Sequence, residues 1–190
     1  MFDVDTLVAD CHSALGDADP RGAVRDVLLK TLEQRGAIAA VLGRDEGGME
    51  ILYNDEDLTV INFIWAPKMT IYPHDHRMWA TIGIYGGAED NTLWRRGEER
   101  IAPAGCRTLE DGEVISLGAD AIHSVHNPRA AYTGAIHVYG GDFVNAPRSQ
   151  WDPDTLLEEP YDIDRVRRLF AEANAEWKAQ LGHDLDEAVD

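Results

Sequence analysis

Apolar residues recur at helical spacing in two stretches near the N-terminus. Residues 4–15 form the first stretch, and residues 20–42 form the second, in which Val24 and Leu28 begin an apolar stripe. Pro20 suits a first helical turn, and the aspartates before it can cap that turn. The pattern predicts helices that pack against the rest of the protein, and it shows no chemistry in this region.

From Met49 to Phe143 the pattern changes to short β-branched and aromatic runs separated by turn signals. Leu58–Trp65 is apolar on both faces, which predicts a buried strand. The other runs that we predict as strands are Ile71–His76, Trp79–Tyr85, Asn91–Arg96, Glu113–Leu117, Ile122–Val125 and Ala131–Tyr139. About eight short strands with turns at this spacing are typical of an all-β sandwich or barrel.

A helical pattern returns from Trp151 onward. Asp162 or Asp164 can cap a run in which Val166 and Phe170 share one face. We expect this tail either to cover an open edge of the barrel or to contact a second subunit, so a homodimer is one expectation. The expected organisation is a single domain, 1–190, with a helical segment over 1–48, a β-barrel over 49–148 and a helical tail over 149–190.

The composition excludes several classes of function. A formal net charge of -18 argues against binding to nucleic acid or to anionic membrane surfaces, both of which select basic proteins. Cys11 and Cys106 are the two cysteines, so no disulfide framework is expected. The first residues are acidic where a signal peptide is basic, and no apolar run approaches the ~20 residues of a membrane span. We therefore expect a cytoplasmic protein.

His74 and His76 are the first candidate functional residues. Side chains two positions apart on a strand project from the same face, so both imidazoles would point at one spot while Asp75 points away. Two neutral nitrogen ligands on a rigid strand make half of a site for a first-row metal. A second histidine motif follows downstream, where His123 precedes Asn127 by three intervening residues.

These motifs resemble those of the cupins, small β-barrels that carry a His-x-His motif followed by a glycine and a later His-x-x-x-Asn motif. His74, His76 and Gly87 match the first motif, and His123 and Asn127 match the second. Within that superfamily the chain looks most like the thiol dioxygenases, the cysteine and 3-mercaptopropionate dioxygenase group. The stretches that carry this likeness, over about residues 50–145, are Pro73–Trp79, the glycines Gly83 and Gly87, Ile122–Asn127 and Ile136–Tyr139.

The resemblance implies an all-β, cupin-type double-stranded β-helix, or jelly-roll barrel, with helical N- and C-terminal segments. It implies that His74, His76 and His123 bind one Fe(II), and that His137 and Tyr139 form a hydrogen-bonding pair beside it. Many cupins carry a glutamate ligand shortly after the histidine pair, whereas this chain has Ala80 there. The expected ligand set is therefore three neutral histidines. Thiol dioxygenases carry a serine before the residues that correspond to His137 and Tyr139, whereas this chain has Ala135 there. A proton relay through His137 and Tyr139 would therefore be shorter.

The implied reaction is the oxidation of a small thiol carboxylate, such as cysteine or 3-mercaptopropionate, to its sulfinate with O2. The substrate carboxylate needs a cation, and the arginine that binds it in cysteine dioxygenases has no clear match near Glu50–Tyr53. The candidates for substrate contacts are Arg95, Arg96, Arg77, Trp79 and Tyr72.

Two other functions stay open at this point. One is a metal-dependent cupin lyase or isomerase that uses zinc, manganese or nickel, with Tyr139 or His137 as the base. The other is a non-catalytic cupin that binds a small ligand, because one fold hosts many functions.

Overall fold

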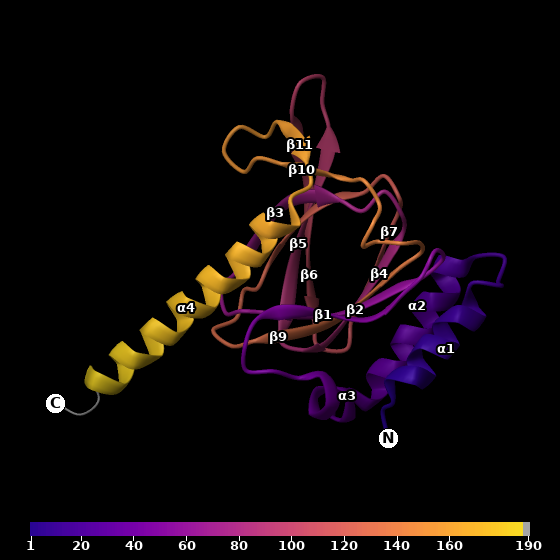
Figure 1. Cartoon of the computed structure of the whole chain (residues 1–190), viewed down its shortest axis with the longest axis horizontal. Helices are drawn as coiled ribbons and strands as arrows, with labels where there is room; N and C mark the ends of the chain where they lie inside the picture. Colours follow the sequence, from indigo (N-terminus) through magenta and orange to yellow (C-terminus); the bar gives the residue numbers. More distant parts are fainter. Residues whose placement is uncertain (188–190) are drawn as a thin grey trace.

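Two antiparallel sheets face each other in the computed structural model, which describes residues 1–187 and the side-chain surroundings of residues 1–181 (Figure 1). The first sheet has the strand order β1-β2-β9-β4-β7 and the second β11-β10-β3-β8-β5-β6. The strands are β1 (Gly48–Asn54), β2 (Thr59–Trp65), β3 (Thr70–Asp75), β4 (Ala80–Gly86), β5 (Ala88–Arg96), β6 (Ile101–Glu110), β7 (Val114–Leu117), β8 (Ile122–His126), β9 (Thr133–Tyr139), β10 (Ser149–Trp151) and β11 (Glu158–Pro160).

Sequence-distant strands pair in both sheets, as in a double-stranded β-helix. In the first sheet β9 lies between β2 and β4, and in the second β8 lies between β3 and β5. The predicted all-β barrel with helical ends is thereby confirmed. No helix among the described residues combines the length and the apolar character needed to cross a membrane.

The first sheet is covered on both faces. Its outer face packs under α1 (Val4–Ala14), α2 (Pro20–Thr31) and α3 (Arg35–Leu42), through Leu28 of α2 against Val138 of β9 among others. Its inner face shares the barrel core with the second sheet. Every residue of β2 and β9 is buried, which accounts for the lack of polar alternation in the sequence of the predicted strand Leu58–Trp65.

Several elements differ from the predictions, and β1 is one strand that was not predicted. The helix expected over 20–42 is divided by η1 (Leu32–Gln34) into α2 and α3. β6 was not predicted; it contains Pro103 and Gly105 and lies at the edge of the second sheet, where both residues are tolerated. The tail expected to be helical from Trp151 begins with strands β10 and β11, and its last three residues lie outside the described chain.

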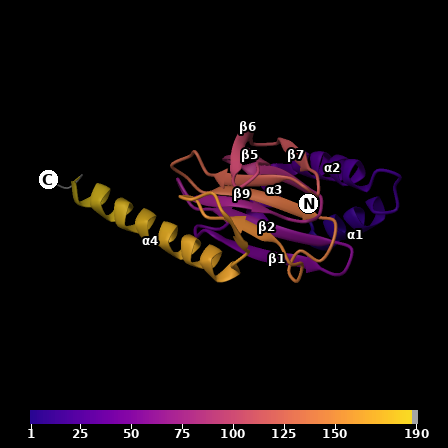
Figure 2. The same cartoon turned by 90° about the horizontal axis from the view of Figure 1, so that it is seen from above.

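The C-terminal helix, α4 (Ile163–Glu187), closes one end of the barrel. Val166 and Phe170 on its first turns belong to the barrel core, and the Phe170 ring stacks on Trp65 of β2 at a centroid distance of 5.6 Å. Asn174 still hydrogen-bonds to the backbone of Gly47. The C-terminal part of α4 then projects away from the barrel, on the side opposite α1 and α2, in both views (Figures 1 and 2). The N-terminal part of α4 therefore packs against the barrel, and contact of this helix with a second subunit stays a prediction.

The motif residues Gly87 and Asn127 hold the barrel together at the ends of strands. Gly87 has a φ of +87°, and a Cβ there would lie 2.3 Å from Oγ1 of Thr133. The Asn127 amide donates to the carbonyls of Trp65 and Ala66. Its Oδ1 accepts from the Thr133 hydroxyl. These two residues therefore fix the turns around the strands that carry the histidines.

Candidate metal centre

Strands β3 and β8 bring the three histidines together. His74 on β3 lies opposite His123 on β8 in the antiparallel register, and His76 follows His74 on the same inward face. All three rings are buried, and one nitrogen from each lies within 4.8 Å of the others. The His74–His76–His123 cluster is thus a candidate metal site, and no carboxylate belongs to it within the described chain.

Hydrogen bonds to the outer nitrogens orient two of these rings. Nδ1 of His74 lies 3.0 Å from the Tyr72 carbonyl oxygen, which can only accept a hydrogen bond. Nδ1 of His123 lies 2.7 Å from Oδ1 of Asn91. Each Nδ1 therefore carries the proton, which leaves the Nε2 lone pair of His74 and of His123 free to bind a metal.

The spacing of the inner nitrogens fits a shared ion. Nε2 of His123 lies 3.1 Å from Nε2 of His76. Two nitrogens bound at right angles, each ~2.1 Å from one ion, would be separated by roughly 3.0 Å. Nδ1 of His76 is buried without a hydrogen-bond partner among the described residues. A set of imidazole nitrogens suits zinc, copper, iron or nickel, so the residues present fit a first-row metal.

Burial keeps these imidazoles neutral. It lowers the pKa of His74 from 6.5 to about 4, and the positive charge of Arg148 adds to this effect. It also lowers the pKa values of His76 and His123 well below 6.5, with a further contribution from the neighbouring histidines. The neutral imidazole is the form that coordinates a metal, so the cluster is ready to bind one at ordinary pH.

His137 and Tyr139 face the cluster from the opposite sheet. Both lie on β9, and the Tyr139 hydroxyl is 3.0 Å from Nδ1 of His137. The Tyr139 ring packs edge-on against His76, with centroids 5.0 Å apart. Burial raises the pKa of Tyr139 well above 10, so its hydroxyl keeps its proton. The two residues are therefore side by side at the cluster, as the strand alternation predicts.

A buried carboxylate, which the sequence analysis did not identify, connects both halves of the site. Oε2 of Glu89 accepts from the Trp65 indole at 2.6 Å, and Oε1 accepts from the Asn91 amide at 2.8 Å. Nε2 of His137 lies 3.5 Å from the same carboxylate. Glu89 thereby fixes the Asn91 amide so that its oxygen faces His123, and it lies behind His137.

The three arginines proposed from the sequence point elsewhere. Arg77 and Arg96 both pair with Asp75, at 2.7 and 3.2 Å, and both also reach Glu158. Asp75 alternates with the histidines, so this ion-pair cluster lies outside the barrel. Arg95 is exposed at the end of β5. None of the three is directed at the histidine cluster in this structure.

The two proposed aromatic residues lie apart from the cluster as well. Trp79 packs against Gly140 and the core beneath the N-terminal helices. The Tyr72 ring lies under the Arg165 guanidinium at 4.5 Å, with its hydroxyl toward the Asp162 carbonyl. Only the backbone carbonyl of Tyr72 takes part in the site, through its hydrogen bond with His74. The Tyr72 side chain is buried in the barrel core, and the pairing of β3 with β8 is irregular between Ile71 and His74.

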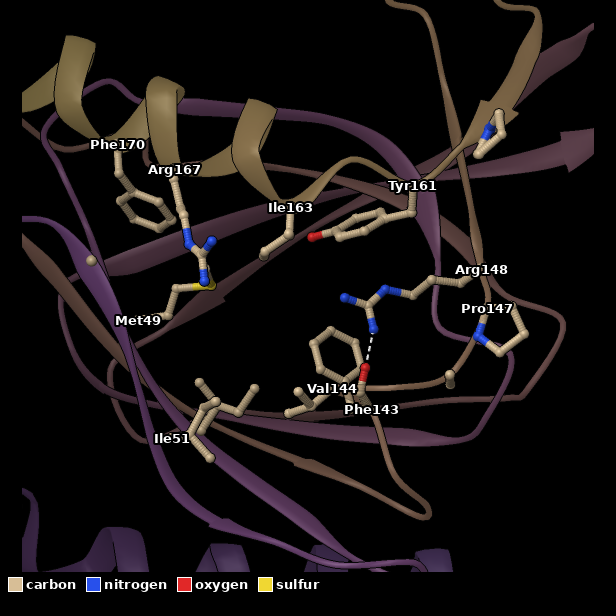
Figure 3. Close-up of a pocket in the computed structure, with 14 residues that line it drawn as sticks. Met49, Ile51, Phe143, Val144, Pro147, Arg148, Tyr161, Ile163, Arg167 and Phe170 are labelled. Carbon is tan, nitrogen blue, oxygen red and sulfur yellow. Dashed lines mark hydrogen bonds between the residues drawn. The ribbon is translucent and has the colours of Figure 1, made fainter.

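Arg148 is the cation that does lie beside the histidines, and no sequence signal marked it. Its guanidinium is stacked between the Phe143 ring, at 3.7 Å, and the Tyr161 ring, at 4.1 Å (Figure 3). It donates to the Phe143 carbonyl. Its Nε is buried without a partner, and it makes no ion pair with a carboxylate in the described part of the chain.

Two cavities meet at this stack. The smaller, about 20 Å³, is lined by His74, His123, His137 and Tyr139 and has room for about one water molecule. The larger, about 660 Å³, opens on the other side of Phe143 and Tyr161. A ligand approaching the histidines from the larger cavity must therefore displace one of these rings or the guanidinium between them.

No family model matches this chain. Among solved structures, it is similar to a Methanocaldococcus jannaschii RmlC-like cupin with a double-stranded β-helix fold, at 13% identity over 54% of this chain and 89% of that chain, TM-score 0.45. It is also similar to a Bacillus halodurans protein, at 15% identity over 55% and 77% of the two chains, TM-score 0.49. Bacillus subtilis oxalate decarboxylase matches at 15% identity over 52% of this chain and 26% of that chain, TM-score 0.41. At these identities the likeness is one of fold and says nothing about the reaction.

Proposed function

We propose that this protein is a mononuclear non-haem Fe(II) dioxygenase that oxidises a small thiol carboxylate to its sulfinate. The observation that supports this most is the ligand set, in which His74, His76 and His123 are neutral and no carboxylate among the described residues joins them. A neutral ligand set leaves the full positive charge on the ion, which favours binding of a thiolate. Zinc, which undergoes no redox change, would not support the oxygen chemistry.

Iron held by the three histidines would supply the oxygen chemistry, in which RSH and O2 give RSO2H without any further reductant. The protein contributes a largely apolar, buried surrounding and hydrogen bonds that orient the ligands. His74 and His123 are held by Tyr72 and Asn91, so their inner lone pairs stay directed at a common point.

The pair on β9 would hold a proton at the reacting end of the substrate. Tyr139 stays protonated because it is buried, and its hydroxyl lies 3.0 Å from Nδ1 of His137. The hydroxyl can instead turn to a polar atom of the substrate beside His76, the ring against which Tyr139 packs. Nε2 of His137 lies 3.5 Å from the Glu89 carboxylate and has no hydrogen-bond partner among the described residues.

Arg148 is the residue that we propose to bind the substrate carboxylate. Its guanidinium lines the larger cavity, is stacked between the two rings that line both cavities, and carries a buried Nε–H without a partner. A carboxylate would pair with the guanidinium fork in a bidentate way. The chain as a whole is strongly acidic, so an anionic substrate needs such a local cation.

The test is oxygen uptake by protein loaded with Fe(II) under anaerobic conditions. On addition of oxygen, we expect consumption that depends on a thiol carboxylate and yields one sulfinate per O2. Zinc-loaded protein and the same acids without the thiol serve as controls. A lack of uptake with every thiol in a panel that includes cysteine and 3-mercaptopropionate would reject the proposal.

A metal-dependent lyase or isomerase is the second candidate. The proximity of Glu89 to Nε2 of His137, at 3.5 Å, favours it, since a carboxylate that orients a histidine is a common arrangement for a general base. Turnover that persists when zinc replaces iron would support this reaction class over the dioxygenase.

A further inference from the structure

The larger cavity is built mainly of apolar side chains. It measures about 660 Å³ and lies between β1, the segment before β10 and the first turns of α4. Figure 3 shows Met49 and Ile51 from β1 on one side and Ile163 and Phe170 from α4 on another, with Arg148 reaching in from the segment before β10. Its size is that of pockets which bind ligands of many atoms.

The cavity and the histidine site share their dividing wall. Phe143 and Tyr161 line both the larger and the smaller cavity, and the Arg148 guanidinium is sandwiched between these two rings. A molecule that extends through this wall would place one end at the histidines, a carboxylate at Arg148 and the remainder in the larger cavity.

A small thiol carboxylate leaves most of that space empty. Cysteine and 3-mercaptopropionate have six or seven non-hydrogen atoms, which occupy at most roughly 200 Å³ if each takes the ~30 Å³ of a water molecule. This is less than a third of the cavity's 660 Å³. Exposed apolar surface in the cavity would then face water, which costs free energy.

We propose that the larger cavity binds an apolar body of the substrate, so that the preferred substrate is a thiol carboxylate bearing an alkyl or aryl group. This inference rests on the proposed function for the thiol end. The carboxylate assignment draws on the unpartnered Nε–H of Arg148, because a buried donor without an acceptor is costly and a bound carboxylate would satisfy it. Arg167 lies at the same cavity but is paired with Asp164 at 2.8 Å, so Arg148 is the better anchor.

Acids without a thiol test the cavity separately from the oxygen chemistry. We would titrate metal-loaded protein with butyrate and with 4-phenylbutyrate in a calorimeter. Burial of the phenyl group should make 4-phenylbutyrate bind at least about tenfold more tightly. Equal affinities, or no detectable binding of either acid, would overturn the proposal.

Variants locate the binding site. Val144→Trp would fill the cavity from a residue that is 46% exposed, and it should abolish the tighter binding of 4-phenylbutyrate relative to butyrate. Val41→Trp on α3, at a similarly exposed residue outside the cavity, is the matched control and should change neither affinity. If Val144→Trp still binds 4-phenylbutyrate more tightly than butyrate by the wild-type factor, the phenyl group binds elsewhere and the assignment of the larger cavity is refuted.

Arg148→Met should weaken both acids by a similar factor, and Arg148→Lys should recover part of the loss. Thermal unfolding of each variant shows whether the fold is kept. If 4-phenylbutyrate binds more tightly than butyrate but no thiol supports oxygen uptake, the proposed reaction is refuted and the assignment of the larger cavity as a binding site is kept. If small thiols are oxidised but 4-phenylbutyrate binds no more tightly than butyrate, the assignment of the larger cavity is refuted and the proposed reaction is kept.

Discussion

Replacement of Glu89 by glutamine should loosen the metal site without touching a metal ligand. The Glu89 carboxylate accepts from Trp65 at 2.6 Å and from Asn91 at 2.8 Å, and His137 lies 3.5 Å away. Trp65 and Asn91 both donate to this side chain, which is fully buried. A glutamine offers one oxygen and one NH2 group, so at least one of these donors would face another donor.

The magnitude follows from the bonds that are lost. A hydrogen bond to a charged group contributes ~1.5–3 kcal/mol, so we expect Glu89→Gln to lower the free energy of unfolding by about 2 kcal/mol. For a domain of this size each kcal/mol corresponds to ~2–4 °C in Tm, which gives a decrease of about 4–8 °C. The Asn91 amide would also lose the bond that keeps its oxygen on Nδ1 of His123. Loss of such an outer partner typically weakens metal binding ~10–100-fold.

Two assays measure these effects. Thermal unfolding of the metal-free protein gives the change in Tm, and competition with a chelating dye gives the affinity for Zn²⁺, which three histidines bind whatever the native metal is. Glu176→Gln is the matched control, since it makes the same chemical change at an exposed position on α4. Wild-type Tm and Zn²⁺ affinity in Glu89→Gln would refute the role that we derive for this carboxylate.

Three further predictions concern the ligands and the barrel. His123→Ala should abolish stoichiometric metal binding, because it removes one of three ligands; elemental analysis that still finds one metal per chain would contradict the assigned cluster. Burial lowers the pKa of His74 from 6.5 to about 4, so the unfolded chain takes up this proton first as the pH falls. The metal-free protein should then lose roughly 1 kcal/mol of stability per pH unit between these values from this group alone. Urea unfolding at pH 7.5, 6 and 5 measures this, and a flat profile would exclude it. Gly87→Ala should destabilise the protein by about 2 kcal/mol or more, since its Cβ would lie 2.3 Å from the Thr133 hydroxyl at a φ of +87°; an unchanged Tm would show that the turn can adjust.

The sequence by itself predicted which histidines come together as the candidate metal site and which kind of fold carries them. The alternation of His74 and His76 along a strand, and of His137 and Tyr139 along another, is a local property of the extended chain, and the structure places each pair on one inward face. The apolar runs likewise predicted most strands, because burial on both faces leaves a continuous hydrophobic pattern. The edge strand β6 was not predicted because it contains Pro103 and Gly105, two residue types with low strand propensity.

Only the tertiary structure decided what surrounds the metal cluster. Glu89 hydrogen-bonds to Asn91, whose side-chain oxygen lies beside Nδ1 of His123. It also lies 3.5 Å from His137, which belongs to the other sheet. The spacing of these residues in the sequence does not predict either contact. The sequence did not predict the position of Arg148, because this residue precedes a short strand in a tail whose pattern is mainly helical. Its position depends on the pairing of β10 with β3. Arg77 and Arg96 pair with Asp75 on the outside of the barrel, although Arg77 directly follows the ligand His76 in the sequence. Contacts between distant segments depend on how the sheets close, and local periodicity carries no information on that closure.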